Sequence, residues 1–254
     1  MIKFGIIAAG EGNRIKSEGA KVSKPLLKIN GVPMIGRLIK IMEESILSLK
    51  QQNETISSDE LPSISVIFNR EMEDVSNYLQ NFVPDVNCDL KIVSTVTPSS
   101  MHSFSKLLEI MEPSDKFIVT TVDTIFRKDE FFKYVESFIK SSENIDGLMG
   151  VTTYKDDEKP LYVVASENMK ITAFKDVPEK GIKFISAGVY GLNIKSIPIL
   201  KSCLDNRIER MRNFQRRLID EGFNLKAYDM GTVFDIDHLS DLEKANKFPK
   251  YFGS

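Results

Sequence analysis

Short apolar runs alternate with longer segments of helical period through the first half of the sequence, and few folds accommodate that order. The runs are rich in Val, Ile and Phe, and each is about as long as one β-strand. Apolar stripes with helical spacing run through Met34–Leu49 and Phe131–Ile139. Near-continuous apolar strands that alternate with helices predict a mostly parallel sheet covered on both faces. The predicted strands are Lys3–Ala8, Ile64–Phe68, Leu90–Thr95, Phe117–Val122, Gly147–Thr152, Leu161–Ala165, Phe184–Asn193 and Leu225–Tyr228.

The second half of the sequence is organised differently. Beyond about residue 150 the predicted strands follow one another more closely, and only one long helical stretch, Ser196–Glu221, interrupts them. No repeat or long linker separates the halves, so we expect one α/β domain: a Rossmann-like, mixed and mostly parallel sheet with a smaller lobe. The polar stretch Gln51–Ser63 is expected to be an exposed loop. The predicted parts of the domain 1–254 are 1–150, a smaller lobe at 151–235, and a closing helix and tail at 236–254.

The composition is that of an ordinary folded protein. The chain has 254 residues, of which 42% are hydrophobic, and a formal net charge of −2. That length can bury a large core, and disordered and low-complexity classes are excluded. The near-neutral charge gives no indication of nucleic acid or an anionic membrane, so an anionic ligand needs a local site. Five arginines lie between Arg207 and Arg217, largely off the apolar stripe Ile208–Leu218, where we expect a solvated or partner-facing surface.

The two isolated cysteines and the short first predicted strand indicate where in the cell the protein is located. Cys88 and Cys203 have no neighbouring cysteine or histidine, so we expect free thiols in a reducing compartment. The apolar part of Lys3–Ala8 is too short for the apolar region of a signal peptide or for a membrane span. We therefore expect a cytoplasmic protein. Without a cluster of Cys, His and Glu at ligand spacing, we expect no zinc.

A glycine loop directly follows the first predicted strand. Gly10 and Gly12 allow a tight turn and bring backbone N–H groups close to a phosphate, at the edge where open α/β sheets bind ligands. Ile15 stands where a dinucleotide-binding fingerprint has its third glycine, and the loop lacks the Gly-Lys-Ser/Thr of a P-loop. Arg14 and Lys24 follow instead, and a guanidinium and an ammonium can hold the oxygens of one phosphate. The sequence therefore predicts a phosphate site of another kind.

The segment Ile6–Ile35 resembles the nucleotidyltransferases that make nucleoside-diphosphate sugars and related activated alcohols. Their signature combines Ala-Gly-x-Gly-x-Arg, Lys-Pro and a Gly-x-Pro-hydrophobic-Ile helix start. Here it stands as Ala9, Gly10, Gly12, Arg14, Lys24, Pro25, Gly31, Pro33 and Ile35. The resemblance implies that Arg14 and Lys24 are catalytic and stabilise charge on the α-phosphate and the leaving pyrophosphate. It also implies a loop around the triphosphate, made of Ala8, Ala9, Gly10, Glu11, Gly12 and Asn13.

A magnesium–triphosphate site needs rigidly held carboxylates, and two segments offer them. Asp123 follows a very apolar predicted strand and stands where the resembling family has its metal-binding Asp. Asp235 and Asp237 point to the same side if their segment is extended. This segment also resembles the one that closes the family's catalytic domain, and alignment with it on Leu242 implies that Asp235 takes the ligand position. The resemblance thus implies Mg²⁺ as the cofactor, held by Asp123 and Asp235. Asp237 is the alternative ligand; otherwise it contacts a ligand or caps the next helix.

The segment Thr95–Ser105 lies where the resembling family contacts the nucleobase with a turn of small residues. Ser99 and Ser100 fit this role, so we expect them to bind the nucleotide, although the usual Gly-Thr is absent. His102 and His238 are the only two histidines. For both, a polar position near a helix start is a simpler interpretation than a ligand contact.

The strand predicted at Phe184–Asn193 resembles the Asn-Ala-Gly-hydrophobic-Tyr strand with which the family lines the pocket for its second substrate. The resemblance implies that Lys175, Ser186 and Gly188 bind this acceptor. Ser186 stands in place of Asn, and Phe-Lys-Asp around Lys175 replaces the usual Glu-Lys-Pro. Because the residues that hold sugar hydroxyls differ, the expected acceptor is either a phosphorylated sugar or a smaller phosphorylated alcohol.

Together these features predict a Mg²⁺-dependent nucleotidyltransferase. An acceptor phosphate oxygen attacks the α-phosphorus of a nucleoside triphosphate, and pyrophosphate leaves in line; no general base is needed, since a phosphomonoester is already anionic near neutral pH. Three alternatives remain open: a molybdopterin guanylyltransferase, a metal-dependent glycosyltransferase with Asp235 and Asp237 as its metal motif, and a non-catalytic nucleotide- or sugar-binding module. The expected partners are the triphosphate and the phosphorylated small molecule, with no nucleic acid and no membrane. A homo-oligomer is compatible with the sequence.

Overall fold

The structure, a computed structural model, describes residues 2–52, 63–82, 86–113, 115–156 and 158–247. Its main sheet consists of β1 (Lys3–Ala8), β4 (Ser63–Phe68), β5 (Asp89–Ser94), β6 (Lys116–Thr121), β8 (Gly147–Thr152), β9 (Tyr162–Ala165), β10 (Ile171–Lys175), β11 (Phe184–Asn193) and β12 (Leu225–Asp229). Two small sheets pair β2 (Lys28–Ile29) with β3 (Val32–Pro33), and β7 (Thr124–Ile125) with β13 (Phe234–Asp235). The predicted mixed α/β sheet is confirmed.

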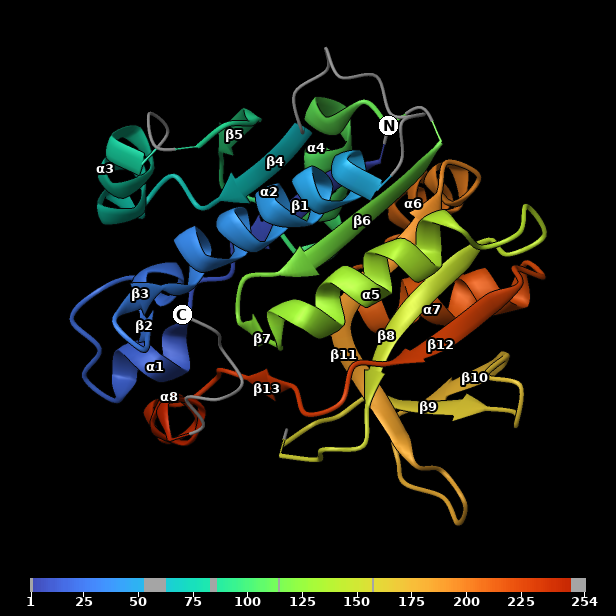
Figure 1. The fold of residues 1–254 in the computed structure, drawn as a ribbon. Coiled ribbons are helices and arrows are strands. Elements are labelled where there is room, and N and C mark those ends of the chain that lie inside the picture. Colours follow the sequence, from blue (N-terminus) through green and yellow to red (C-terminus); the bar gives the residue numbers. More distant parts are fainter. Residues whose placement is uncertain (1, 53–62, 83–85, 114, 157, 248–254) are drawn as a thin grey trace.

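The sheet has a parallel part and a mixed part, in the order β10-β9-β11-β6-β1-β4-β5, with β8 beside β11 and β12 beside β8 (Figure 1). β1 pairs in parallel with β4 and β6, and β4 with β5. β11 runs antiparallel to β6, β8 and β9. Because parallel strands end at the same edge, the carboxyl ends of β1 and β6 lie side by side, with Ile7 opposite Thr121.

Helices cover both faces of the sheet (Figure 1). On one face lie α2 (Met34–Gln52) and α5 (Lys128–Ile139); on the other lie α4 (Ser100–Met111), α6 (Ser196–Asp205) and α7 (Met211–Asp220). The remaining helices are α1 (Asn13–Ser17), η1 (Lys24–Leu26), α3 (Glu73–Phe82) and α8 (Leu239–Asn246). Phe4 and Ile6 of β1 belong to the core under α2, and Ile7 to the core under α4, as side-chain alternation requires. Across the described ranges, no helix combines the length and hydropathy that a bilayer crossing needs.

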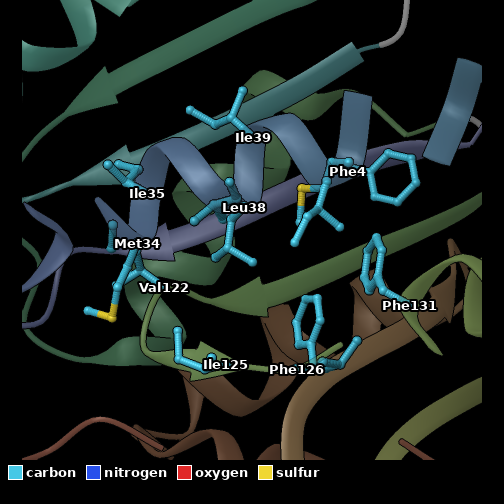
Figure 2. Packing of buried hydrophobic residues seen from close by; sticks show 14 of the residues in the cluster. Phe4, Met34, Ile35, Leu38, Ile39, Val122, Ile125, Phe126 and Phe131 are labelled. Carbon is cyan, nitrogen blue, oxygen red and sulfur yellow. The ribbon is translucent and has the colours of Figure 1, made fainter. Parts of the chain in front are cut away.

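Apolar packing around the end of β6 holds the segment that contains Asp123. Val122 and Ile125, which flank this residue, are 4% and 0% exposed. Figure 2 shows both side chains in the apolar layer beneath α2, with Phe126 and Phe131 beside them; the two rings stack with centroids 4.9 Å apart. Burying a side chain of this size stabilises the fold by about 1.5–3 kcal/mol. The core therefore fixes the backbone on both sides of Asp123.

The eight predicted strands are all present, with ends that differ by at most one residue. The prediction of one helical stretch over Ser196–Glu221 is wrong, because Arg207 adopts a left-handed φ of 59° and separates α6 from α7. Strand β10 was not predicted. Most of the loop predicted at Gln51–Ser63 (53–62), and the end of the predicted tail (248–254), lie outside the described residues. Both cysteines are free, as expected.

Candidate active site

The loop that follows β1 turns into α1 through a left-handed residue. Gly12 has φ +63°, a conformation that L residues with a side chain rarely adopt. A Cβ on Gly12 would also lie 3.0 Å from the Cβ of Lys24. Glycine at this position therefore allows the loop to run directly against the segment that carries Lys24.

Lys24 begins the turn η1 and is only 8% exposed. Ser23, the residue before it, donates hydrogen bonds from its backbone N–H and from Oγ to the carboxylate of Asp74 on α3, at 2.8 and 2.7 Å. Pro25 follows at a position where proline is favoured, since its φ suits the turn and no donor is lost there. These contacts fix the segment so that it presents a buried ammonium group at the sheet edge.

The pairing of β13 with β7 brings three carboxylates to that edge. Its antiparallel register places Asp235 opposite Thr124. The backbone N–H of Ile236 donates to the carbonyl of Asp123 at 3.2 Å. Asp235 and Asp237 consequently stand beside Asp123, although they are far from it in the sequence. One oxygen of each carboxylate lies within 4.8 Å of those of the other two.

The ammonium of Lys24 lies between two of these carboxylates. Its Nζ is 2.6 Å from Oδ2 of Asp123 and 2.8 Å from Oδ1 of Asp237, and Arg14 donates to Asp237 as well. Burial alone would lower the pKa of Lys24, but the three carboxylates outweigh burial and raise that pKa. Burial alone would raise the pKa of Asp123, but the charge of Lys24 prevails and lowers it. Both groups are therefore charged near neutral pH.

The glycine loop borders a cavity of about 570 Å³, here called the loop cavity. The sequence-predicted residues that line it are Ala9, Gly10, Glu11, Gly12, Asn13, Arg14, Lys24, Ser99, Ser100, Asp123 and Asp237. Ala8 is not among the lining residues; it ends β1 and is buried in the core. Ser99 lies just before α4, and its Oγ is 2.9 Å from Nδ1 of His102. His102 thus makes a local contact at a helix start, in line with its simpler interpretation.

A second cavity of about 430 Å³ opens along β11 and is here called the β11 cavity. Ser186 and Gly188 line it, as does Asp235. Lys175 is not among its lining residues, and its Nζ is 2.6 Å from a carboxylate oxygen of Glu179. Lining residues that the sequence analysis did not place in a site include Tyr154, Asp156, Lys159, Tyr190, Arg210, Arg212 and Gln215.

Part of the arginine-rich segment takes part in this cavity. Arg207, Arg210 and Arg217 are exposed, as expected of a solvated surface, but the segment also contributes lining residues. The break at Arg207 directs the start of α7 to the cavity, where Arg210 and Arg212 line it. Guanidinium groups of Arg212 and Arg216 lie 2.6 and 2.7 Å from the carboxylate oxygens of Asp176. Hydrogen bonds from Arg216 and Arg212 lower the pKa of Asp176. Asp176 therefore holds the first turns of α7 in place.

The two cavities meet at the carboxylates. Asp123 and Asp237 line both cavities, as do Ser100 and Thr121. Two ligands, one in each cavity, would therefore have their ends next to the same charged cluster. Holding two reactants side by side in the right geometry can remove about 7–11 kcal/mol of the barrier to a group transfer.

Comparison with protein-family models shows what kind of protein carries this pair of cavities. The model of the nucleotidyl transferase family matches residues 5–249. The chain belongs to that family. The match includes the glycine loop, Asp123 and the segment with Asp235 and Asp237, so all parts of the site lie within it. Comparison with curated proteins gives no match.

Solved structures share the fold of this nucleotidyltransferase at low sequence identity. The inositol-1-phosphate CTP transferase from T. maritima is 20% identical with a TM-score of 0.73, over 99% of this chain and 96% of that one. A Bacillus anthracis protein assigned as a glucose-1-phosphate thymidylyltransferase is 21% identical with a TM-score of 0.76, over 98% and 95%. HddC from Yersinia pseudotuberculosis is 21% identical with a TM-score of 0.68, over 97% and 99%. These likenesses confirm the predicted fold.

The second histidine of the nucleotidyltransferase also has a local role. His238 precedes α8, and its backbone N–H donates to the carboxylate of Asp241 at 2.8 Å. Its ring contacts the carboxylate of Glu18, and this hydrogen bond raises the pKa of His238. His238 therefore ties the helix start to the end of α1, as the interpretation of a polar residue near a helix start predicts.

Proposed function

We propose that this nucleotidyltransferase transfers a nucleoside monophosphate from a nucleoside triphosphate to a phosphorylated sugar or similar phosphorylated alcohol. The observation that carries the proposal is the meeting of the two cavities at Asp123 and Asp237. The loop cavity would take the triphosphate, and the β11 cavity the acceptor. Structural neighbours named as transferases for inositol 1-phosphate and glucose 1-phosphate support a phosphorylated acceptor.

In the proposed reaction, an oxygen of the acceptor's phosphate forms a bond to the α-phosphorus. The bond from that phosphorus to the oxygen bridging to the β-phosphate breaks, and its electron pair leaves with pyrophosphate. The glycine loop, with Ala9, Gly10, Glu11, Gly12 and Asn13, would hold the phosphates through backbone N–H groups. Arg14 and Lys24 would neutralise the charge on the reacting phosphates. Ser99 and Ser100 would contact the nucleotide at the other side of the loop cavity.

We propose Mg²⁺ as the cofactor, held by Asp123 and Asp235, with Asp237 as the alternative ligand. The donor set fits, because carboxylate oxygens are the ligands that Mg²⁺ prefers, and this cluster already surrounds one cationic group, the ammonium of Lys24. When bound, the ion would neutralise phosphate charge and help to orient the triphosphate. Lys24 would then turn from the carboxylates to the phosphates.

We assign the acceptor's phosphate to the cationic end of the β11 cavity. Arg210 lines this end at the start of α7 and can form a bidentate contact with a phosphate. Ser186 and Gly188 would contact the remainder of the acceptor. Lys175, which pairs with Glu179 outside the lining of the cavity, would reach the acceptor only after leaving that pair.

The division of the domain follows from the same proposal. Residues 1–150 would bind the nucleotide, 151–235 would bind the acceptor, and the segment from 236 would close the site. Nearly all residues that line the loop cavity come from the first part, which supports this division. Free cysteines support a location in the cytoplasm.

The proposal is tested by pyrophosphate release. The four common nucleoside triphosphates are combined with a panel of phosphorylated sugars and alcohols, each with Mg²⁺ and with excess chelator. We expect release with at least one pair, dependent on the acceptor and abolished by the chelator. Release from a triphosphate in water alone, or with unphosphorylated sugars only, would contradict the proposal.

A further inference from the structure

Gln215 carries a buried polar atom that the protein does not satisfy. Its Oε1 has no hydrogen-bond partner among the described residues, and the residue is 2% exposed. Ser65 on β4 has a similarly buried and unpartnered Oγ. The two residues differ in place: Gln215 lines the β11 cavity, whereas Ser65 lines neither cavity. The unpaired amide of Gln215 therefore lies where a ligand can reach its side chain.

The position of Gln215 in α7 is one that the fold would fill with an apolar residue. Met211, Phe214 and Leu218 share its buried stripe and belong to one apolar cluster. An amide oxygen buried without a partner destabilises the fold, whereas Leu or Met at this position would not. The packing of α7 gives no reason for glutamine here, so a ligand that enters the β11 cavity is the remaining reason.

The neighbours of Gln215 limit what it can bind. Tyr190 and Ser186 line the same cavity and are hydrogen-bonded to each other, and burial raises the pKa of Tyr190 to about 12, so its hydroxyl keeps its proton. Arg210, which precedes α7, and Arg212, one turn before Gln215, also line the cavity, and Arg212 pairs with Asp176. The cavity thus combines the guanidinium of Arg210, which can bind a phosphate, with the neutral side chain of Gln215, whose buried amide oxygen lacks a hydrogen-bond donor.

We propose that Gln215 determines acceptor specificity, by accepting a hydrogen bond from a hydroxyl group of a phosphorylated sugar or polyol. This inference rests on the proposed function, and it narrows the acceptor to phosphate monoesters that carry a free hydroxyl near the phosphate. Esters without a hydrogen-bond donor leave the buried amide unpaired, and they are disfavoured for that reason.

The experiment compares wild type with Gln215→Met, which keeps length and volume and removes the amide. Ser65→Ala is the matched control, because it removes an equally buried and unpartnered polar atom away from both cavities. Pyrophosphate release is measured with glucose 1-phosphate and inositol 1-phosphate, which carry hydroxyls, and with phosphocholine and ethyl phosphate, which carry none. Thermal unfolding of the three proteins is measured without ligands.

We expect Gln215→Met to lower kcat/KM for the hydroxyl-bearing acceptors by about ten- to a hundredfold, with KM for the triphosphate unchanged. Its unfolding temperature should equal or exceed that of wild type, since an unpaired polar group is removed. Ser65→Ala should keep the kinetics of wild type. The inference is overturned if Gln215→Met keeps the kcat/KM of wild type, if its KM for the triphosphate rises in parallel, or if its unfolding temperature falls. It is also overturned if wild type prefers the hydroxyl-free esters.

The outcomes separate this inference from the function on which it rests. A wild type that releases no pyrophosphate with any triphosphate and any phosphorylated acceptor overturns the proposed transfer, and the role of Gln215 with it. A wild type that is active while Gln215→Met matches it in kcat/KM overturns the role of Gln215 alone.

Discussion

Single residues show that the protein satisfies the charges of its proposed site internally. Lys24 pairs with Asp123 and Asp237 at 2.6 and 2.8 Å, so the ammonium occupies the place where a metal ion or phosphate would otherwise act on those groups. An isolated buried charge is costly, and pairing avoids that cost. Ligand binding must therefore exchange these partners rather than fill an uncharged site.

Removal of the ammonium tests this exchange. We expect Lys24→Met to reduce turnover by about 10²-fold or more, the effect of losing one charge contact to the reacting phosphates. The same change should tighten the binding of Mn²⁺ in the absence of nucleotide, because no internal cation competes for the carboxylates. Calorimetry gives the metal affinity, with exposed Lys28→Met as the control. Turnover like that of wild type would exclude Lys24 from the site.

Gly12 is required both for its left-handed backbone conformation and for its close contact with Lys24. We expect Gly12→Val to abolish triphosphate binding, because its Cβ would meet Lys24 at 3.0 Å and narrow the loop cavity. The positive φ should also cost about 1–3 kcal/mol of stability. Gly181→Ala is the control: it shares a positive φ, with nothing within 4 Å of its Cβ. If calorimetry finds the same nucleotide affinity in Gly12→Val as in wild type, the loop is only a structural turn.

At the scale of elements, the apolar pattern of the sequence predicted the longer strands, whose formation depends on burial of their side chains. The strands that were predicted have apolar runs long enough to be recognised in the sequence. In contrast, β7 and β13 have two residues each and form only by pairing with one another. The break between α6 and α7 was missed because Arg207, which adopts φ 59°, is not a residue that marks helix ends. One sequence signal for the β11 cavity was not used: Gln215 is a polar residue within the apolar stripe of α7.

Helix α3 positions the Lys24 segment through Asp74. The hydrogen bonds from Ser23 outweigh burial and lower the pKa of Asp74 from its usual 3.8. A lowered folded-state pKa contributes stability that is present above 3.8 and is lost as the pH falls through the folded-state value. We expect Asp74→Ala to lower the free energy of unfolding by about 1 kcal/mol at pH 7, a modest loss because the contact with Ser23 is partly exposed.

That difference between wild type and Asp74→Ala should shrink below about pH 4. Urea unfolding at pH 7 and at pH 3 measures it, with Glu73→Ala, from the same helix turn, as the control. Because Asp74 acts by positioning Lys24, kcat should fall as well, while Glu73→Ala keeps it. A difference that stays constant from pH 7 to pH 3 would show that the charge of Asp74 contributes nothing.

At the scale of the whole molecule, the site exists only because the mixed half of the sheet continues directly from the parallel half and the chain then returns to β7. β11 joins the parallel strands next to β6, and β13 returns the chain to β7 (Figure 1). The position after a strand at one sheet edge pointed to Asp123 and the glycine loop, whereas Asp235 and Asp237 were singled out through the family resemblance of their segment. It did not predict Arg210 in the β11 cavity, or Lys175 outside its lining, because those positions depend on how α7 and β10 pack.

The three carboxylates test this long-range assembly. We expect Asp123→Asn and Asp235→Asn each to cripple pyrophosphate release, and the double variant to be little worse than either, since residues that act as a unit are not additive. Asp237→Asn should be milder, because Asp237, unlike Asp123, also pairs with Arg14. Mn²⁺ affinity should follow the same order. If instead Asp237→Asn is the crippling change and Asp235→Asn the mild one, Asp237 is the ligand, and Asp235 serves only the pairing of β13 with β7.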